Sequence, residues 1–164
     1  PFHHRLTMIE LATQDSPTLE ATDLEGRRQG LSYSIETLKE FHRLYKSNLE
    51  LFFIIGMDAF LELDSWKEYT HLFDYANFVV INRPGVQMEE LEPFLLSLGI
   101  EFKKEKGRDV YAIPSGNTVT YREGTLIDIS STRIREMVAL GKSIRYLVPD
   151  SVLTYIMEKG LYKD

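Results

Sequence analysis

The fold is decided by a short apolar stretch, Leu49-Glu50-Leu51-Phe52-Phe53-Ile54-Ile55-Gly56. Polar residues precede it and a glycine ends it, a pattern that favours a strand buried on both faces. A second short apolar run, Phe78 to Ile81, follows a helical pattern from Trp66 to Ala76. Strands that alternate with helices in this way predict an α/β fold, with a parallel sheet flanked by helices.

Further helices are predicted where apolar residues recur every three or four positions. They begin at Phe2, at a cap of Ser32 or Ser34, after Asp58, at Glu89, at Arg133, and at a cap of Asp150 or Ser151. One ends near Lys46 to Asn48, and others end at Gly99, Gly141 and Gly160, where a left-handed residue is tolerated. Additional strands are predicted at Leu19 to Ala21, Val110 to Ile113 and Leu126 to Ile129.

Composition limits the class of protein. With 164 residues, 43% of them hydrophobic, the chain is long enough for one well-filled core, and we expect a single domain. The net charge of −6 argues against binding to nucleic acid or to an anionic membrane. There is no cysteine, no apolar run long enough to span a membrane, and no signal pattern after Pro1. We therefore expect a soluble, cytoplasmic protein.

Two loops are candidates for ligand binding, because ligands of parallel sheets bind beyond the carboxyl ends of the strands. The turn Ile129-Ser130-Ser131-Thr132 offers backbone N–H groups and hydroxyls at a helix N-terminus, where anions bind favourably. Arg133 and Arg135 follow, at positions where cations oppose the helix dipole unless a phosphate is present. A well-capped helix with solvated arginines is the alternative interpretation.

The second loop is Gly56-Met57-Asp58, in which the carboxylate could accept hydrogen bonds from ribose; a simple turn glycine followed by a cap is the alternative. Trp66, the sole tryptophan, is either a core anchor or a stacking surface for a heteroaromatic ring. Exposed N–H groups after Tyr33 could hold a carboxylate or phosphate, although most helix caps hold nothing. The histidines have no ligand spacing, so we assign no metal site to side chains.

Several segments together identify the chain as resembling the nicotinate-nucleotide adenylyltransferases. The strongest are Ile129-Ser130-Ser131-Thr132-Arg133-Ile134-Arg135 and Ser143-Ile144-Arg145-Tyr146-Leu147-Val148-Pro149. In family order they are preceded by Ser32 to Leu38, Phe53 to Asp58, the Trp66 segment and Phe78 to Gly85, and followed by Gly160-Leu161-Tyr162. The resemblance covers nearly the whole chain and is weakest between Glu89 and Arg122. It implies a Rossmann-like fold that transfers AMP from ATP to nicotinate mononucleotide.

The resemblance also implies which residues bind each substrate. The implied ATP-binding residues are Gly56, Asp58, Ile129, Ser130, Ser131, Thr132 and Arg135, of which Thr132 and Arg135 would also be catalytic. The implied nicotinate mononucleotide site comprises Tyr33, Ser34, Trp66, Lys67 and Arg83. Relatives often have Thr at the position of Ser34 and an aromatic residue or His at that of Lys67. Mg²⁺ bound to the nucleotide is the implied cofactor.

The sequence lacks the motifs with which the family opens, a first strand with a Gly-Gly-Thr-Phe-Asp-Pro loop and a His-x-Gly-His segment. We therefore expect that the chain is an N-terminally incomplete copy and that these 164 residues alone are weakly active or inactive. Two alternatives stay open: a related enzyme such as phosphopantetheine adenylyltransferase, and a regulatory module that binds nucleotide without turnover. A homo-oligomer is also compatible with the sequence.

Overall fold

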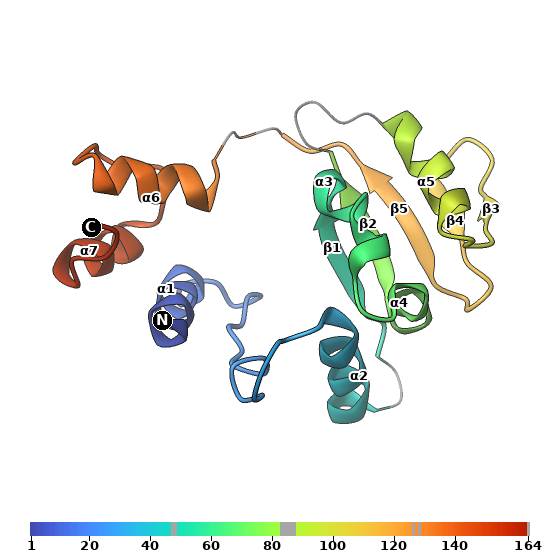
Figure 1. The fold of residues 1–164 in the computed structure, drawn as a ribbon, viewed down its shortest axis with the longest axis horizontal. Coiled ribbons are helices and arrows are strands. Elements are labelled where there is room, and N and C mark those ends of the chain that lie inside the picture. The colour runs from blue at the N-terminus through green and yellow to red at the C-terminus, as the bar shows by residue number, and fades with distance from the viewer. Residues whose placement is uncertain (47–48, 83–87, 126, 128, 164) are drawn as a thin grey trace. The chain divides into compact units, whose positions relative to one another are not determined.

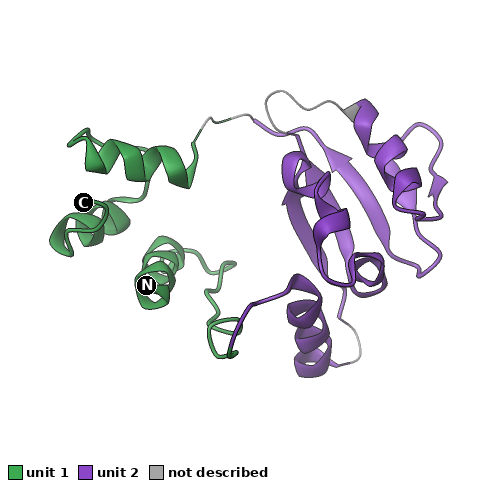
Figure 2. Cartoon of the chain, viewed as in Figure 1, with its two compact units in different colours: residues 1–29, 127–164 green, residues 30–126 purple. Residues whose placement is uncertain are grey.

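The computed structural model describes residues 1–46, 49–82, 88–125, 127 and 129–163. These form two compact units, one made of Gly30–Leu126 and the other of Pro1–Gln29 with Ile127–Asp164 (Figure 2). In the part of the chain that is described, no helix combines the length and the apolar character that a bilayer crossing requires.

The unit Gly30–Leu126 is built on a five-stranded sheet in the order β1-β2-β5-β4-β3 (Figure 1). The strands are β1 (Phe52–Gly56), β2 (Asn77–Ile81), β3 (Lys103–Lys104), β4 (Val110–Ala112) and β5 (Thr118–Arg122). β1, β2 and β5 pair in parallel, whereas β4 pairs antiparallel with both β5 and β3. The predicted α/β class is therefore confirmed, with an antiparallel extension on a parallel half.

The helices of this unit follow the order expected from the sequence. They are α2 (Ser34–Tyr45), α3 (Met57–Phe60), η1 (Leu63–Ser65), α4 (Tyr69–Tyr75), η2 (Met88–Glu90) and α5 (Leu91–Ser97). Aromatic side chains fill the core between helices and sheet, and Phe78 of β2 lies 4.9 Å from Phe73 and 6.1 Å from Phe60, measured between ring centroids. Such ring pairs stabilise the core beyond their buried area.

A buried asparagine ties the three parallel strands together at their beginnings. The Oδ1 atom of Asn77 accepts hydrogen bonds from the backbone N–H of Thr118 (2.9 Å) and from its hydroxyl (3.0 Å). The backbone N–H of Asn77 donates to the carbonyl of Leu51, just before β1, at 2.8 Å. Because these partners satisfy the polar groups, burying this amide among apolar residues costs little.

The unit formed by the two ends of the chain contains α1 (Phe2–Thr13), α6 (Ser131–Ala139) and α7 (Asp150–Glu158). Its core cluster consists of Ile134, Val138, Ile144, Val152 and Ile156. The first helix is tied to the last, because the Ser151 hydroxyl donates to the Leu11 carbonyl at 3.1 Å.

Some expectations are confirmed and others are wrong. The stops at Gly99, Gly141 and Gly160 are confirmed, and each of these glycines has the positive φ that side chains disfavour. The caps proposed for α2 and α7 are wrong, since their N-cap residues are Tyr33 and Pro149. At both positions the chain enters the helix without a side-chain cap.

The strand predictions need three corrections. β1 is not buried on both faces: Phe52 and Ile54 are 52% and 68% exposed, because successive side chains of a strand point to opposite faces and only the face with Phe53 and Ile55 packs in the core. Leu19 to Ala21 is not a strand, and the N–H of Leu19 donates instead to the Ser16 carbonyl at 3.4 Å. Ile127 and Ile129 also lie outside strands, bent by a hydrogen bond from the Ile129 N–H to the Ile127 carbonyl, and Leu126 and Asp128 lie outside the described residues.

Candidate functional site

A hollow of about 340 Å³ lies in the unit Gly30–Leu126 and unites residues from two segments of the chain. Its lining residues are Ser32, Tyr33, Ser34, Ser65, Trp66 and Lys67. We call this the Trp66 hollow. Four of the five residues predicted for the nicotinate mononucleotide site are therefore neighbours; the fifth, Arg83, lies outside the described residues.

One wall of the Trp66 hollow is the beginning of α2. Tyr33, the N-cap residue, is extended (φ −116°, ψ 136°) and makes no side-chain cap hydrogen bond. Its carbonyl accepts from the N–H of Glu36 at 3.0 Å, which starts the helical hydrogen bonding. The first N–H groups of a helix have no partner within the helix, so this wall presents the positive end of the helix dipole.

The opposite wall is the turn between η1 and α4. The sequence predicted Trp66 on a helix, but Trp66 precedes α4. The reason is that the chain is extended at Trp66 (φ −84°, ψ 147°) after the 3₁₀ helix η1. Its ring is half-buried and lies edge-on to Phe53 of β1, with centroids 6.2 Å apart. The core thus supports the ring, and part of it remains accessible in the hollow.

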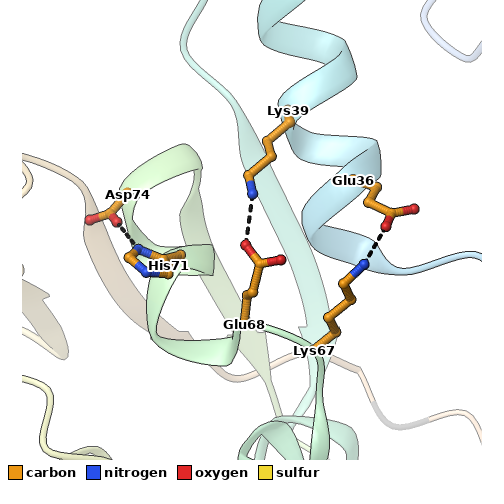
Figure 3. A network of polar contacts seen from close by, with 6 residues as sticks. All are labelled: Glu36, Lys39, Lys67, Glu68, His71 and Asp74. Carbon is orange, nitrogen blue, oxygen red and sulfur yellow. Dashed lines mark hydrogen bonds and ion pairs between the residues drawn. The ribbon is translucent and has the colours of Figure 1, made fainter.

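Two ion pairs join these walls (Figure 3). The Lys67 ammonium donates to Oε1 of Glu36 at 2.6 Å, and the Lys39 ammonium donates to Oε2 of Glu68 at 2.7 Å. The hydrogen bond that Lys67 donates to Glu36 raises the pKa of Lys67, and the one that Glu68 accepts from Lys39 lowers the pKa of Glu68. Both shifts favour the charged form of the group.

The second candidate site lies in the other unit, at the beginning of α6. Ser130 is the N-cap, and its hydroxyl accepts a hydrogen bond from the Arg133 N–H at 3.2 Å. A cap within the Ser130 to Thr132 turn is therefore confirmed, but α6 begins at Ser131 and not at Arg133 as predicted. Arg135 donates from Nη2 to the Thr132 hydroxyl at 3.1 Å. This contact holds a guanidinium beside the first turn of the helix.

A small hollow of about 140 Å³ adjoins this turn. It is lined by Ile129, Ser130, Arg133, Ile134, Met137 and Leu147. The floor is apolar and the rim carries a hydroxyl and a guanidinium, a combination that suits a ligand with both apolar and anionic parts.

Gly56 and Asp58 lie at the carboxyl end of β1, at the edge where ligands of parallel sheets bind. Met57 between them is fully buried and begins α3, whereas Asp58 is exposed. The sequence thus alternates an anchoring side chain with one that faces solvent. Within the described residues, no three His, Cys, Asp or Glu side chains gather as a metal site would require.

The residues that tie the walls of the Trp66 hollow were missed by sequence analysis: Glu36, Lys39 and Glu68. Glu36 and Lys39 are three residues apart and therefore share a helix face, a spacing that is visible in the sequence. Their partners, Lys67 and Glu68, are about 30 residues further along the chain, and nothing in a single sequence marks that pairing.

Comparisons with known proteins identify the family. Residues 1–137 match the cytidylyltransferase-like family. The chain is 45% identical over 164 residues to a protein of Geotalea uraniireducens (strain Rf4) named "Probable nicotinate-nucleotide adenylyltransferase", covering 99% of this chain and 76% of the relative. A relative of the same name from Geobacter metallireducens (strain ATCC 53774 / DSM 7210 / GS-15) is 44% identical over 163 residues, with 99% and 75% covered.

The fold also matches a solved structure. Nicotinic acid mononucleotide adenylyltransferase of Plasmodium falciparum, complexed with NaAD, superimposes with a TM-score of 0.70 at 20% identity, covering 99% of this chain and 74% of that one. At this identity the match supports the fold, and the relatives at 45% and 44% identity support the family resemblance seen in the sequence. The chain belongs to the cytidylyltransferase-like family and, within it, to the nicotinate-nucleotide adenylyltransferases.

Proposed function

We propose that this protein transfers the AMP part of ATP to nicotinate mononucleotide, giving deamido-NAD and pyrophosphate. The observation that carries the proposal is the Trp66 hollow, in which a supported indole ring, a helix N-terminus and an ammonium group surround a space of about 340 Å³. A flat ring bearing a carboxylate matches these three features.

In this proposal the nicotinate ring stacks on Trp66. Backbone N–H groups at Tyr33 and Ser34 donate to its carboxylate, and Lys67 supplies a positive charge at the rim. Relatives often have Thr at the position of Ser34, and this difference does not affect the proposed binding because the hydrogen-bond donors are backbone groups. A role for Arg83 in binding the mononucleotide remains a prediction from the family resemblance.

Two further elements are proposed to bind ATP, the turn before α6 and the carboxyl end of β1. The turn from Ile129 to Thr132 would hold phosphates with its N–H groups and hydroxyls, assisted by Arg135. Gly56 and Asp58 at the end of β1 would meet the adenosine, with the exposed carboxylate accepting hydrogen bonds from ribose hydroxyls.

The chemistry requires no protein nucleophile. A phosphate oxygen of the mononucleotide attacks the α-phosphorus of ATP, a new P–O bond forms, and the bond from the α-phosphorus to the oxygen bridging to the β-phosphate breaks with loss of pyrophosphate. The catalytic task is to position two anions and to stabilise developing charge. We assign the charge stabilisation to Arg135 and the α6 N-terminus, with Thr132 orienting the guanidinium.

Mg²⁺ belongs to the proposal as an ion brought by the nucleotide. The groups at the α6 turn are hydroxyls, N–H donors and guanidinium, which suit an anion and not a cation held by the protein. We therefore derive no step through the metal. A cytoplasmic location and self-association remain predictions.

Pyrophosphate release from ATP tests the proposal, with nicotinate mononucleotide and phosphopantetheine compared as acceptors. Release that depends on nicotinate mononucleotide is the expected result. Isothermal titration with each acceptor accompanies the assay. Preference for phosphopantetheine would contradict the proposal. Tight binding of nucleotide without product would indicate a regulatory module instead.

A further inference from the structure

Lys67 is the charged member of the Trp66 hollow. The other five lining residues are three serines, a tyrosine and a tryptophan, which are neutral at neutral pH. Glu36, the partner of Lys67, is not among the lining residues. Among the residues that line the hollow, Lys67 is therefore the one whose side chain carries a positive charge, and the carboxylate that balances it comes from a residue outside the lining.

Two contacts hold the Lys67 ammonium at this rim. Its Nζ atom donates to Glu36 at 2.6 Å and lies 4.6 Å from the centroid of the Tyr33 ring. An ammonium over an aromatic face is attracted by the negative face of the ring. Both partners come from the beginning of α2, so the charge is fixed beside the helix N-terminus that forms the opposite wall.

The backbone next to Lys67 is constrained as well. Glu68 has left-handed backbone angles (φ 52°, ψ 39°), which are uncommon for a residue with a side chain. Its carbonyl accepts from the His71 N–H at 2.9 Å as α4 begins, while its carboxylate accepts from Lys39. The turn is thus held from both sides, and a backbone conformation of this kind persists only when its surroundings enforce it.

We propose that Lys67 is a specificity-determining residue: its ammonium selects a ring that bears a carboxylate over one that bears a neutral amide, and Glu36 is the positioning residue that places it. This inference rests on the proposed function and deepens it. A carboxylate pairs its own negative charge with the ammonium, whereas a carboxamide offers the ammonium only an uncharged carbonyl acceptor.

Binding to the hollow can be followed without turnover, because Trp66 is the only tryptophan in the chain. Nicotinate mononucleotide and nicotinamide mononucleotide are titrated separately against the full chain, and quenching of Trp66 fluorescence gives the two dissociation constants. Their ratio measures the discrimination. Since the two ligands differ only in the carboxylate or amide group, contributions of ribose and phosphate cancel.

The variant K67M removes the charge and retains the apolar stem. A matched control is K104M, since Lys104 is also paired to a glutamate (Glu92, 3.1 Å) and lies over a tyrosine ring (Tyr111, 5.1 Å), but on β3 and outside the lining of the hollow. The two lysines are exposed to 41% and 42%, so both substitutions disturb the surface equally.

K67M should reduce the discrimination roughly tenfold, through weaker binding of the acid, while the amide binds as before. K104M should leave the ratio unchanged. E36Q should reduce the ratio a few-fold, because the Lys67 ammonium loses the carboxylate that positions it. This reduction is expected even though E36Q removes a negative charge near the hollow. A K67M variant whose ratio of dissociation constants equals that of the wild type would overturn the role of Lys67, and an E36Q variant with an unchanged or increased ratio would overturn the positioning role of Glu36.

The wild-type chain separates this inference from the proposed function. Equal dissociation constants for the two mononucleotides would overturn the inference and leave the proposed nicotinate site intact. If neither mononucleotide quenched Trp66 fluorescence, the Trp66 hollow would not be the nicotinate site. Melting curves of K67M and E36Q that match the wild type ensure that a change in the ratio reports on binding.

Discussion

The Trp66 hollow and the turn at the beginning of α6 are built in opposite ways. The α6 turn is local: its cap, its guanidinium and its N–H groups all come from residues 129–135. The hollow is assembled from two segments about 30 residues apart, held by ion pairs and ring contacts. We infer that the α6 turn depends on a few adjacent residues, whereas the Trp66 hollow depends on contacts between two distant segments.

The largest effect is expected at Arg135. Replacing it by methionine removes the charge proposed to stabilise the transition state, and kcat of pyrophosphate release should fall by about 100-fold. Binding of nicotinate mononucleotide, measured by Trp66 fluorescence, should change less than about twofold, since a charge that acts mainly in the transition state adds little to ground-state affinity. T132V should lower kcat less, because it removes only the 3.1 Å contact that orients the guanidinium. R135K is the control for charge alone, and wild-type turnover in R135M would contradict the assignment.

A smaller effect, on binding, is expected at Trp66. Base–aromatic stacking is worth about 1–3 kcal/mol by alanine substitution, so W66A should weaken nicotinate mononucleotide roughly 10- to 100-fold. Titration calorimetry is the measurement, because this variant has no tryptophan to report. W66F retains a ring and should recover most of the affinity. If W66A lost as much affinity for ATP as for nicotinate mononucleotide, the Trp66 hollow would not be specific for the mononucleotide as proposed.

A still smaller effect concerns the cap of α6. Ser130 satisfies the N–H of Arg133, and S130A should cost about 1 kcal/mol of unfolding free energy in a urea titration. S131A, one residue into the helix, serves as the control and should cost less. If S130A instead leaves stability unchanged but weakens ATP binding, the hydroxyl contacts the ligand and is not mainly a cap.

Local chemistry explains which parts of the structure could be predicted. The cap at Ser130 and the stops at Gly99 and Gly160 depend on a few adjacent residues, and the sequence contains all of them. The apolar runs behind β1 and β2 were recognisable for the same reason, since hydrophobic periodicity is a local property. The cap and first turn of α6 belong to this predictable part, and phosphate binding at the turn stays a prediction.

Long-range pairing explains what could not be predicted. The sequence did not show that β4 runs antiparallel to β5, because that choice depends on which strands meet. It placed Trp66 on a helix, since an apolar spacing does not reveal the 3₁₀ turn that delays α4 until Tyr69. The pairs Glu36–Lys67 and Lys39–Glu68 require the folded unit and were therefore invisible.

The smallest effect is expected at Glu68, where the ion pair with Lys39 should stabilise the fold and the left-handed backbone should destabilise it. E68Q removes the negative charge and keeps the side chain, so it loses the ion pair with Lys39 and retains the left-handed backbone. E68G loses the same ion pair but tolerates positive φ, because glycine has no Cβ. E68G should therefore melt at a higher temperature than E68Q in parallel calorimetric scans.

The pH dependence of the same pair gives a second measurement. Lys39 lowers the pKa of Glu68 below its ordinary value of 4.5, so the folded state favours the charged carboxylate. The resulting stabilisation is present above pH 4.5 and is lost as the pH falls through the lowered pKa. The difference in melting temperature between wild type and E68Q should thus be small at neutral pH, because the pair is half-exposed, and should vanish in acid. A difference that persists below the lowered pKa would mean that the stabilisation by Glu68 does not come from its charge.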